Sequence, residues 1–232
     1  MWNGKNKAIT FSYDDGTMQD IRLAELFHKY ELKATFNLNS EKLGTPNTLL
    51  REGVQVDHTK IKPEDVKSVY AGHEVAAHTL THPHLTKITD DAEIIRQVEQ
   101  DRLNLSELVG YEVVGFAYPG GGINHSPRIA ELIRKHTGIK YARTADSNYA
   151  FELQNHLLQF MPTVHHHASI DYLFELTEQF FAMDTDRPQL LYIWGHAFEF
   201  DIHDDWARFE EFCQFVSGHN DIFYGTNKEV LL

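Results

Sequence analysis

Cysteine and long apolar runs are scarce in this sequence, and both absences narrow the class of protein. Cys213 is the only cysteine among 232 residues, so an internal disulfide is excluded, and its amphipathic helical surroundings predict a buried core thiol. The chain has no run of about 18 apolar residues, which a membrane-spanning helix would need. Residues 1–7 lack the apolar segment of a signal peptide. We therefore expect a soluble, cytoplasmic protein with no membrane partner.

Basic residues are also few, since lysine and arginine total 21 against 34 aspartates and glutamates, a net charge of −13. Nucleic-acid binding depends on clustered lysines and arginines that neutralise phosphates, so this balance argues against a nucleic-acid partner. No pattern indicates an obligate protein partner. Hydrophobic residues make up 42% of the chain, which predicts a folded rather than a disordered protein. The fifteen histidines are unusual and prompt a search for a metal site.

Short apolar runs alternate with helical patterns along nearly the whole chain. Seven runs are predicted to be strands: 8–13, 33–38, 73–78, 113–118, 140–144, 157–164 and 190–194. Helices are predicted over 20–29, 90–109, 127–136, 170–183 and 206–216. Such alternation indicates parallel strands joined by crossover helices. We predict one α/β domain over residues 1–232, a closed or nearly closed barrel of mostly parallel strands, with an open doubly wound sheet as the alternative.

Residues 40–62 interrupt this alternation. They are polar and irregular, with Gly44, Pro46 and Gly53 among them, and a short helix is predicted to begin at Pro63. We expect the segment to run over the surface of the barrel.

Four of the predicted strands are followed by residues that carry chemistry. They are two adjacent acids, a histidine pair, a glycine-rich turn and a single histidine: Asp14 and Asp15, His78 and His82, residues 119–122, and His196. In parallel α/β folds the carboxyl ends of the strands lie on one rim and hold the active site. We therefore expect these side chains to share one site.

Each of these features has a structural explanation when it is taken alone. Adjacent acids before glycine are common in turns, a His-x3-His pair occurs on surface helices, and a lone histidine is often a hydrogen-bonded core residue. On one rim, however, two histidines and one aspartate make a facial metal-binding set that leaves positions open for water and substrate. The second aspartate could then face the bound water.

Four segments resemble the successive motifs of the polysaccharide deacetylases, also called NodB-homology or carbohydrate esterase family 4 enzymes. In order, they are Thr10-Phe-Ser-Tyr-Asp-Asp-Gly16, Gly72-His-Glu-Val-Ala-Ala-His-Thr-Leu-Thr-His82, Phe116-Ala-Tyr-Pro-Gly-Gly121 and Leu191-Tyr-Ile-Trp-Gly-His196. The resemblance spans nearly the whole chain. It implies a distorted (β/α)7 barrel, which agrees with the seven strands predicted above.

The resemblance also implies an activity, the removal of N-acetyl groups from an N-acetylated sugar or polysaccharide. Asp15, His78 and His82 would hold one divalent metal, most simply zinc, with Co, Ni, Mn or Fe as alternatives. Asp14 would act as general base on the attacking water, and His196 would protonate the departing amine. The alternatives are an O-acetyl esterase or small cyclic-amide hydrolase, and a metal- or sugar-binding domain without catalysis.

Two departures from the family pattern concern the residues that support catalysis. The third motif usually has arginine after phenylalanine, where this chain has Ala117. Arg143 could supply that charge, although a salt-bridged surface arginine is the simpler interpretation. Without the family's arginine, we expect Asp14 to be held ionised chiefly by the metal and to be more basic than in relatives that carry the arginine. The family's Asp-Trp motif is not recognisable between residues 123 and 190, and Asp205-Trp206 comes too late in the chain to be equated with it.

Tyr118, Pro119, Gly120 and Trp194 are the remaining candidate substrate contacts. A backbone N–H near Gly120 would hold the oxyanion of the tetrahedral intermediate, because a missing Cβ lets the backbone approach the reacting carbon. The two aromatic residues could stack on a sugar ring, although core packing would explain both equally. Residues 165–167 are three histidines after a predicted strand, and one of them could line the site.

Overall fold

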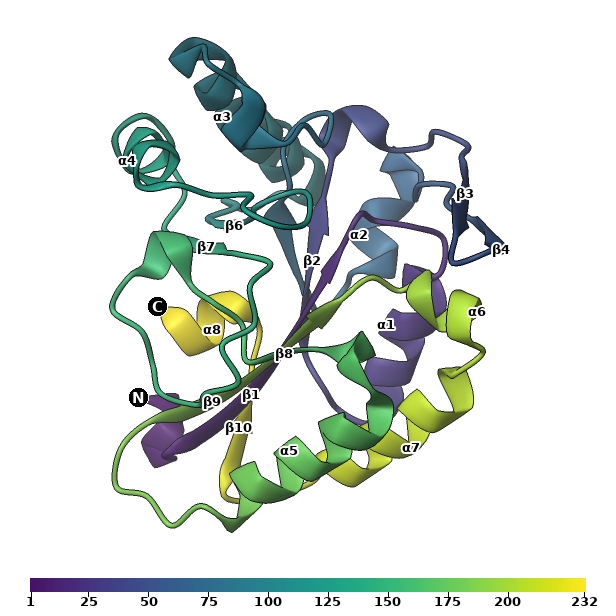
Figure 1. The fold of residues 1–232 in the computed structure, drawn as a ribbon, viewed down its shortest axis with the longest axis vertical. Coiled ribbons are helices and arrows are strands. Elements are labelled where there is room, and N and C mark those ends of the chain that lie inside the picture. Colours follow the sequence, from purple (N-terminus) through teal and green to yellow (C-terminus); the bar gives the residue numbers. More distant parts are fainter.

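The computed structural model describes residues 1–167 and 169–232. A curled parallel sheet forms the centre of the molecule (Figure 1), in the order β7-β6-β5-β2-β1-β9-β8, with β10 paired to the first half of β1. The strands are β1 Lys7–Asp14, β2 Ala34–Leu38, β5 Glu74–Ala77, β6 Gly115–Ala117, β7 Tyr141–Arg143, β8 Val164–His165, β9 Gln189–Gly195 and β10 Ile222–Tyr224.

Helices connect these strands and cover the outside of the sheet. They are α1 Asp20–Lys29, α2 Val66–Val69, α3 Asp91–Val109, α4 Pro127–His136, α5 Ile170–Ala182, α6 Glu199–His203, α7 Trp206–Val216 and α8 Asn227–Leu231. Local sequence fixes several of their ends. The Asp90 side chain accepts a hydrogen bond from the Ala92 N–H at the start of α3, and Gly110 ends that helix in the left-handed conformation.

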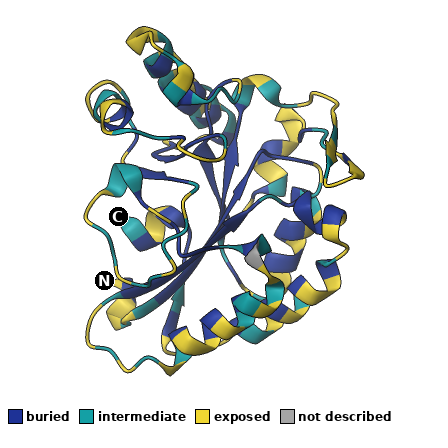
Figure 2. Ribbon diagram, viewed as in Figure 1, coloured by how far each residue is buried: buried dark blue, intermediate teal, exposed yellow. Residues whose placement is uncertain are grey.

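The strands are buried on both faces, as Figure 2 shows, whereas the helices expose one side. Continuous burial of this kind is typical of parallel strands that are covered on both sides, and it explains why these strands are mostly apolar in sequence. Aromatic rings fill the space between β1 and its helices, with Tyr13 lying against Phe27, Phe200 and Phe209.

The sheet comes close to closing on itself. Its two ends are β7 and β8, and Phe160 forms a single parallel bridge to Arg143 before the chain enters β8. The result is a half-barrel of parallel strands that matches the distorted (β/α)7 barrel of the sequence analysis, so that prediction is confirmed. None of the helices in the described residues is long and apolar enough to cross a bilayer.

The prediction for residues 157–164 was largely wrong. Residues 157–159 form a 3-10 turn, and only Val164, with the following His165, pairs with β9. Pro162 lies between these parts, and proline has no N–H to contribute to a strand ladder. The C-terminal β10 and α8 were not predicted at all.

Residues 40–62 are more ordered than expected. They contain an antiparallel hairpin made of β3 (Thr48–Arg51) and β4 (Val54–Asp57), which Figure 1 shows at the right-hand margin. Val56 and Leu49 pack against Phe198, which directly precedes α6, and against Ile202 within that helix. The hairpin therefore contacts the rim of the barrel instead of only crossing its surface.

Candidate metal-dependent active site

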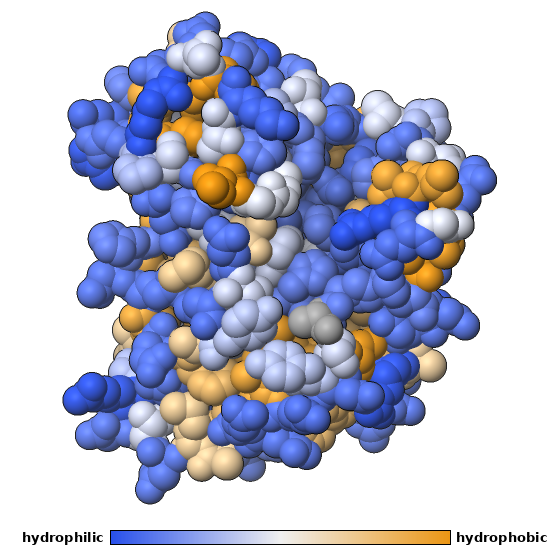
Figure 3. All heavy atoms as spheres, in the orientation of Figure 1, coloured by the Kyte–Doolittle hydropathy of each residue, from blue (hydrophilic) through white to orange (hydrophobic). Residues whose placement is uncertain are grey.

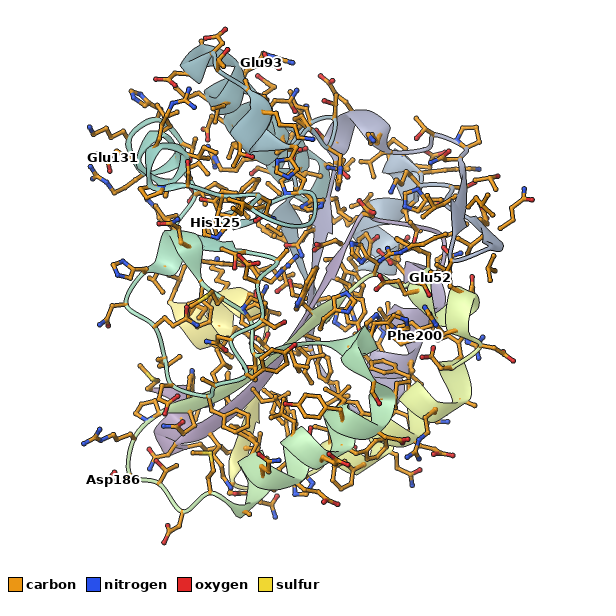
Figure 4. The ribbon with its side chains drawn as sticks, viewed as in Figure 1. Glu52, Glu93, His125, Glu131, Asp186 and Phe200 are labelled. Atoms are coloured by element: carbon orange, nitrogen blue, oxygen red, sulfur yellow. The ribbon has the colours of Figure 1, made fainter. Side chains whose placement is uncertain are left out.

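The carboxyl ends of the strands surround one cavity of about 340 Å³. Six residues singled out in the sequence line it together: Asp14, Asp15, His78, His82, Gly120 and His196. The cavity lies on the face shown in Figure 3, between hairpin β3–β4 and the loop that follows β6. Figure 4 labels Glu52 in the turn of the hairpin and Phe200 in α6, the two elements that border this rim on one side.

Asp15, His78 and His82 bring three metal-ligand atoms together. Asp15 Oδ1 lies 3.5 Å from His82 Nε2 and 4.0 Å from His78 Nε2. The Nδ1 of His78 is 2.8 Å from the Ala117 carbonyl oxygen, so this nitrogen carries the proton and Nε2 presents its lone pair to Asp15. Burial lowers the pKa of His82 to about 4 and also lowers that of His78, so both rings are neutral at pH 7.

This donor set fits a divalent metal. The three ligand atoms lie within 4.8 Å of one another, and ligands with bonds of about 2.0–2.1 Å around a tetrahedral ion are separated by about 3.3 Å. Two neutral imidazoles and one carboxylate are the ligand types that zinc hydrolases use, and three protein ligands leave a position for water or substrate.

Asp14 is buried beside Arg143, and both of its carboxylate oxygens accept hydrogen bonds from Nη2 of that arginine. Arg143 exposes only 1% of its surface, so the interpretation as a surface arginine was wrong. Burial alone would raise the pKa of Asp14, but the guanidinium outweighs it and holds the pKa below its usual range. The expectation that Asp14 depends chiefly on the metal to stay ionised was therefore also wrong.

His196 faces the cavity and has a carboxylate behind it that the sequence analysis missed. Its Nδ1 lies 3.2 Å from Glu199 Oε2, and its backbone N–H donates to the same oxygen at 3.1 Å. Burial alone would lower the pKa of His196, but the charge of Glu199 raises it to about 9, so the ring is protonated at pH 7. The sequence could have indicated this contact, because Glu199 is an acid three residues after the histidine, at the start of a helix.

His165 and His166 also approach Glu199 Oε2, at 3.3 and 2.9 Å, and the three residues could be taken for a second metal site. The hydrogen bonds argue against that. The His167 N–H donates to Nδ1 of His165, which leaves the ring proton on Nε2, the atom that points at the carboxylate. A protonated nitrogen cannot ligate a metal. We therefore interpret this group as a hydrogen-bond network around Glu199, continued by Tyr13, whose hydroxyl lies 3.1 Å from His166 Nδ1.

The predicted substrate contacts differ in how accessible they are from the cavity. Tyr118 borders the cavity but exposes 1% of its surface, and its hydroxyl donates to the Leu158 carbonyl, so core packing explains it. Pro119 is buried and is not among the residues that line the cavity. Trp194 lines the cavity, but only 8% of the residue is exposed, and its ring lies 4.4 Å from the Arg143 guanidinium. Gly120 lines the cavity at φ +84°, and a Cβ there would meet the His84 ring at 2.9 Å.

The fold and the donor set together make a parallel α/β barrel with a potential metal site on its rim. The sequence profile of the polysaccharide deacetylase family matches residues 3–142, more than half of the chain, and the chain belongs to this family. No curated protein matches the sequence.

Solved structures share this fold at low sequence identity. A probable polysaccharide deacetylase from Pseudomonas aeruginosa PAO1 has a TM-score of 0.73 and 14% identity, covering 99% of this chain and 91% of its own. A Puue allantoinase has a TM-score of 0.71 and 13% identity over the same shares, 99% and 91%. A family 4 carbohydrate esterase from Streptomyces lividans, in complex with acetate, has a TM-score of 0.58 and 15% identity, covering 96% and 93%.

Proposed function

We propose that this protein is a metal-dependent deacetylase that hydrolyses the N-acetyl group of an N-acetylated carbohydrate. One observation carries the proposal. An ionised carboxylate, Asp14, and a protonated imidazole, His196, line the same cavity as the Asp15, His78 and His82 donor set. Amide hydrolysis needs a base for water and an acid for the amine, and a domain that only binds sugar or metal needs neither.

The residues of this chain divide the reaction among them. A divalent metal held by Asp15, His78 and His82 would supply a Lewis acid that acidifies water and polarises the acyl carbonyl. Asp14 accepts the proton of the attacking water as the carbon–oxygen bond forms. A backbone N–H near Gly120 stabilises the oxyanion of the tetrahedral intermediate. His196 then donates its proton to the amine nitrogen as the carbon–nitrogen bond breaks, and acetate and a free amine result.

Glu199 acts on this reaction through His196. A buried carboxylate that contacts the imidazole stabilises its charged form, so the acid stays protonated until the amine takes its proton. Arg143 acts in the same way on Asp14 and keeps it ionised. Both are positioning residues, and together they keep the base and the acid in opposite protonation states at one pH.

A second candidate function is hydrolysis of a small cyclic amide. The same base and acid would open a ring carbon–nitrogen bond, and the product would remain one molecule. The cavity favours this candidate, because Leu49 and Arg51 of the hairpin and His58 directly after it line one side of the cavity and narrow the space for a polymer. The Puue allantoinase, named for an enzyme of a small cyclic substrate, shares the fold.

Product analysis separates these candidates. Acetate release is measured from chitooligosaccharides and acetylated xylan, and ring opening from a cyclic ureide, each with added zinc and with a chelator. Acetate from the chitooligosaccharides that stops with the chelator supports the proposal. Turnover of the ureide alone supports the second candidate, and turnover of xylan alone indicates an esterase. If the zinc-loaded native protein turns over none of these substrates faster than an Asp14→Asn variant does, the protein is a binding domain without catalysis.

A further inference from the structure

We propose that His58 and Lys60 are positioning residues of Asp15 that act on metal affinity in opposite directions. His58 orients the carboxylate for the metal, whereas Lys60 competes with the metal for the same oxygen. The inference rests on the proposed metal-dependent function and concerns two residues in the segment that was expected to be a surface excursion.

Backbone hydrogen bonds fix this segment beside the loop that carries Asp15. The N–H of Ile61 donates to the Gly16 carbonyl at 2.8 Å, and the N–H of Met18 donates to the Thr59 carbonyl at 2.9 Å. These bonds surround Lys60, which forms an antiparallel bridge with Thr17. Residues 58–60 therefore keep a fixed position relative to the residues that directly follow Asp15.

His58 contacts the oxygen of Asp15 that does not face the histidine pair. Its Nε2 lies 3.3 Å from Asp15 Oδ2, whereas the distances to His78 and His82 are measured to Oδ1. The side-chain amide of Asn47 lies 3.1 Å from His58 Nδ1 and can donate to it, which places the ring proton on Nε2. The Lys60 ammonium also lies 3.4 Å from Nε2, but the carboxylate is nearer, at 3.3 Å, and it can only accept. His58 then donates to Oδ2, and Oδ1 keeps facing the space between His78 and His82, where the metal would bind. Hydrogen bonds of this kind orient ligating carboxylates.

Lys60 approaches the other oxygen. Its Nζ lies 3.7 Å from Asp15 Oδ1, the atom that would ligate the metal, and its side chain is only 4% exposed. A buried ammonium needs a nearby anion, and Asp15 provides it. A divalent ion on the same oxygen would then lie close to a fixed positive charge that water hardly screens. Lys60 should therefore weaken metal binding at a site that His58 strengthens.

The test measures zinc affinity and not turnover. The full-length protein is stripped of metal and titrated with Zn²⁺ against a chelating indicator of known affinity. We expect His58→Ala to weaken zinc binding by about 10–100-fold, and His58→Gln, which keeps an N–H donor, to recover part of the loss. We expect Lys60→Met to tighten zinc binding by about tenfold or more. Lys62→Met is the matched control, because Lys62 is an exposed lysine two residues further along the same segment.

The opposite signs distinguish this proposal from a general structural role, since local unfolding would weaken zinc binding in both variants. Lys60→Arg keeps the charge and should leave the affinity near the native value. If Lys60→Met does not fold, Lys60→Arg still tests the proposal, because an Arg variant that bound zinc much more tightly would contradict competition by charge. The proposal is overturned if Lys60→Met binds zinc no more tightly than Lys62→Met, or if His58→Ala matches the native protein. A native protein that binds no zinc would overturn the proposed function as well.

Discussion

Ala117 and Arg143 lie directly opposite each other on neighbouring strands β6 and β7. Ala117 occupies the position where the family's third motif usually has its arginine. In this chain the guanidinium comes from the adjacent strand and reaches the same carboxylate, Asp14. The guanidinium can reach this carboxylate from β7 because two residues in register on parallel strands start from nearly the same place on the rim.

This relationship makes a prediction about the acid limb of the pH profile. Arg143 stabilises the ionised form of Asp14, so Arg143→Gln should raise the pKa of that carboxyl by about 1–3 units. A more basic Asp14 becomes protonated at higher pH, and the acid limb of kcat/KM should move to higher pH. The measurement is a pH profile on one amide substrate.

The neighbouring strand supplies the control for that prediction. Ala117→Arg alone should not move the limb downward, since Asp14 is already paired. In an Arg143→Ala background, the same Ala117→Arg change should return part of the shift, because the new guanidinium starts opposite the old one. A limb that stays in place in Arg143→Gln would show that Asp14 is not the group that titrates.

The alkaline limb should report Glu199. This carboxylate raises the pKa of His196 to about 9, so the native enzyme should lose its protonated acid only as the pH rises through that region. Glu199→Gln removes the charge, lowers the pKa of His196, and should move the alkaline limb down by about one unit or more. Glu52→Gln, on the exposed turn of the hairpin, should leave the limb where it is. Coinciding limbs in the native and Glu199→Gln enzymes would contradict the assignment of His196 as the acid.

The two neighbouring acids should respond differently to the same change. Asp14→Asn should keep the metal and lose about 10²–10⁴-fold in kcat, because it removes the proton acceptor and leaves the ligands in place. Asp15→Asn should lose metal affinity as well, and a His78→Ala, His82→Ala double variant should lose it almost completely. Metal content is measured by elemental analysis alongside turnover. Equal zinc occupancy in all of these variants would remove the basis for the ligand assignment.

The sequence alone could predict the candidate ligands better than the groups that surround them. His78 and His82 are four residues apart after an apolar strand, so both their spacing and their place on the rim can be inferred from the sequence. Arg143 and Asp14 are far apart in sequence, and their contact depends on strand order and register, which one sequence does not reveal.

Other features escaped prediction for different reasons. Hairpin β3–β4 has mostly exposed positions and only Val56 is buried, so it shows little of the alternation that marks a strand. Its contribution of His58 to the site could not be foreseen without the hairpin itself. Glu199 could have been predicted, because it lies only three residues after His196, at the start of α6.

Replacing Gly195 with a larger residue should destabilise the protein, because His166 lies directly against this glycine. A Cβ at this position would lie 2.5 Å from two atoms of the His166 ring, which is fixed between Tyr13 and Glu199. Since the ring has no free direction in which to move, Gly195→Ala should lower the free energy of unfolding by about 1–3 kcal/mol. Gly121→Ala is the control, because nothing lies within 4 Å of a Cβ there.

A double-mutant cycle identifies the cause of that loss. His166→Ala removes the ring, so Gly195→Ala should cost much less in that background than in the native protein. Urea unfolding of the four proteins in the presence of a chelator measures the coupling without any contribution from metal binding. Equal costs in the two backgrounds would show that backbone conformation, and not the contact with His166, requires glycine at position 195.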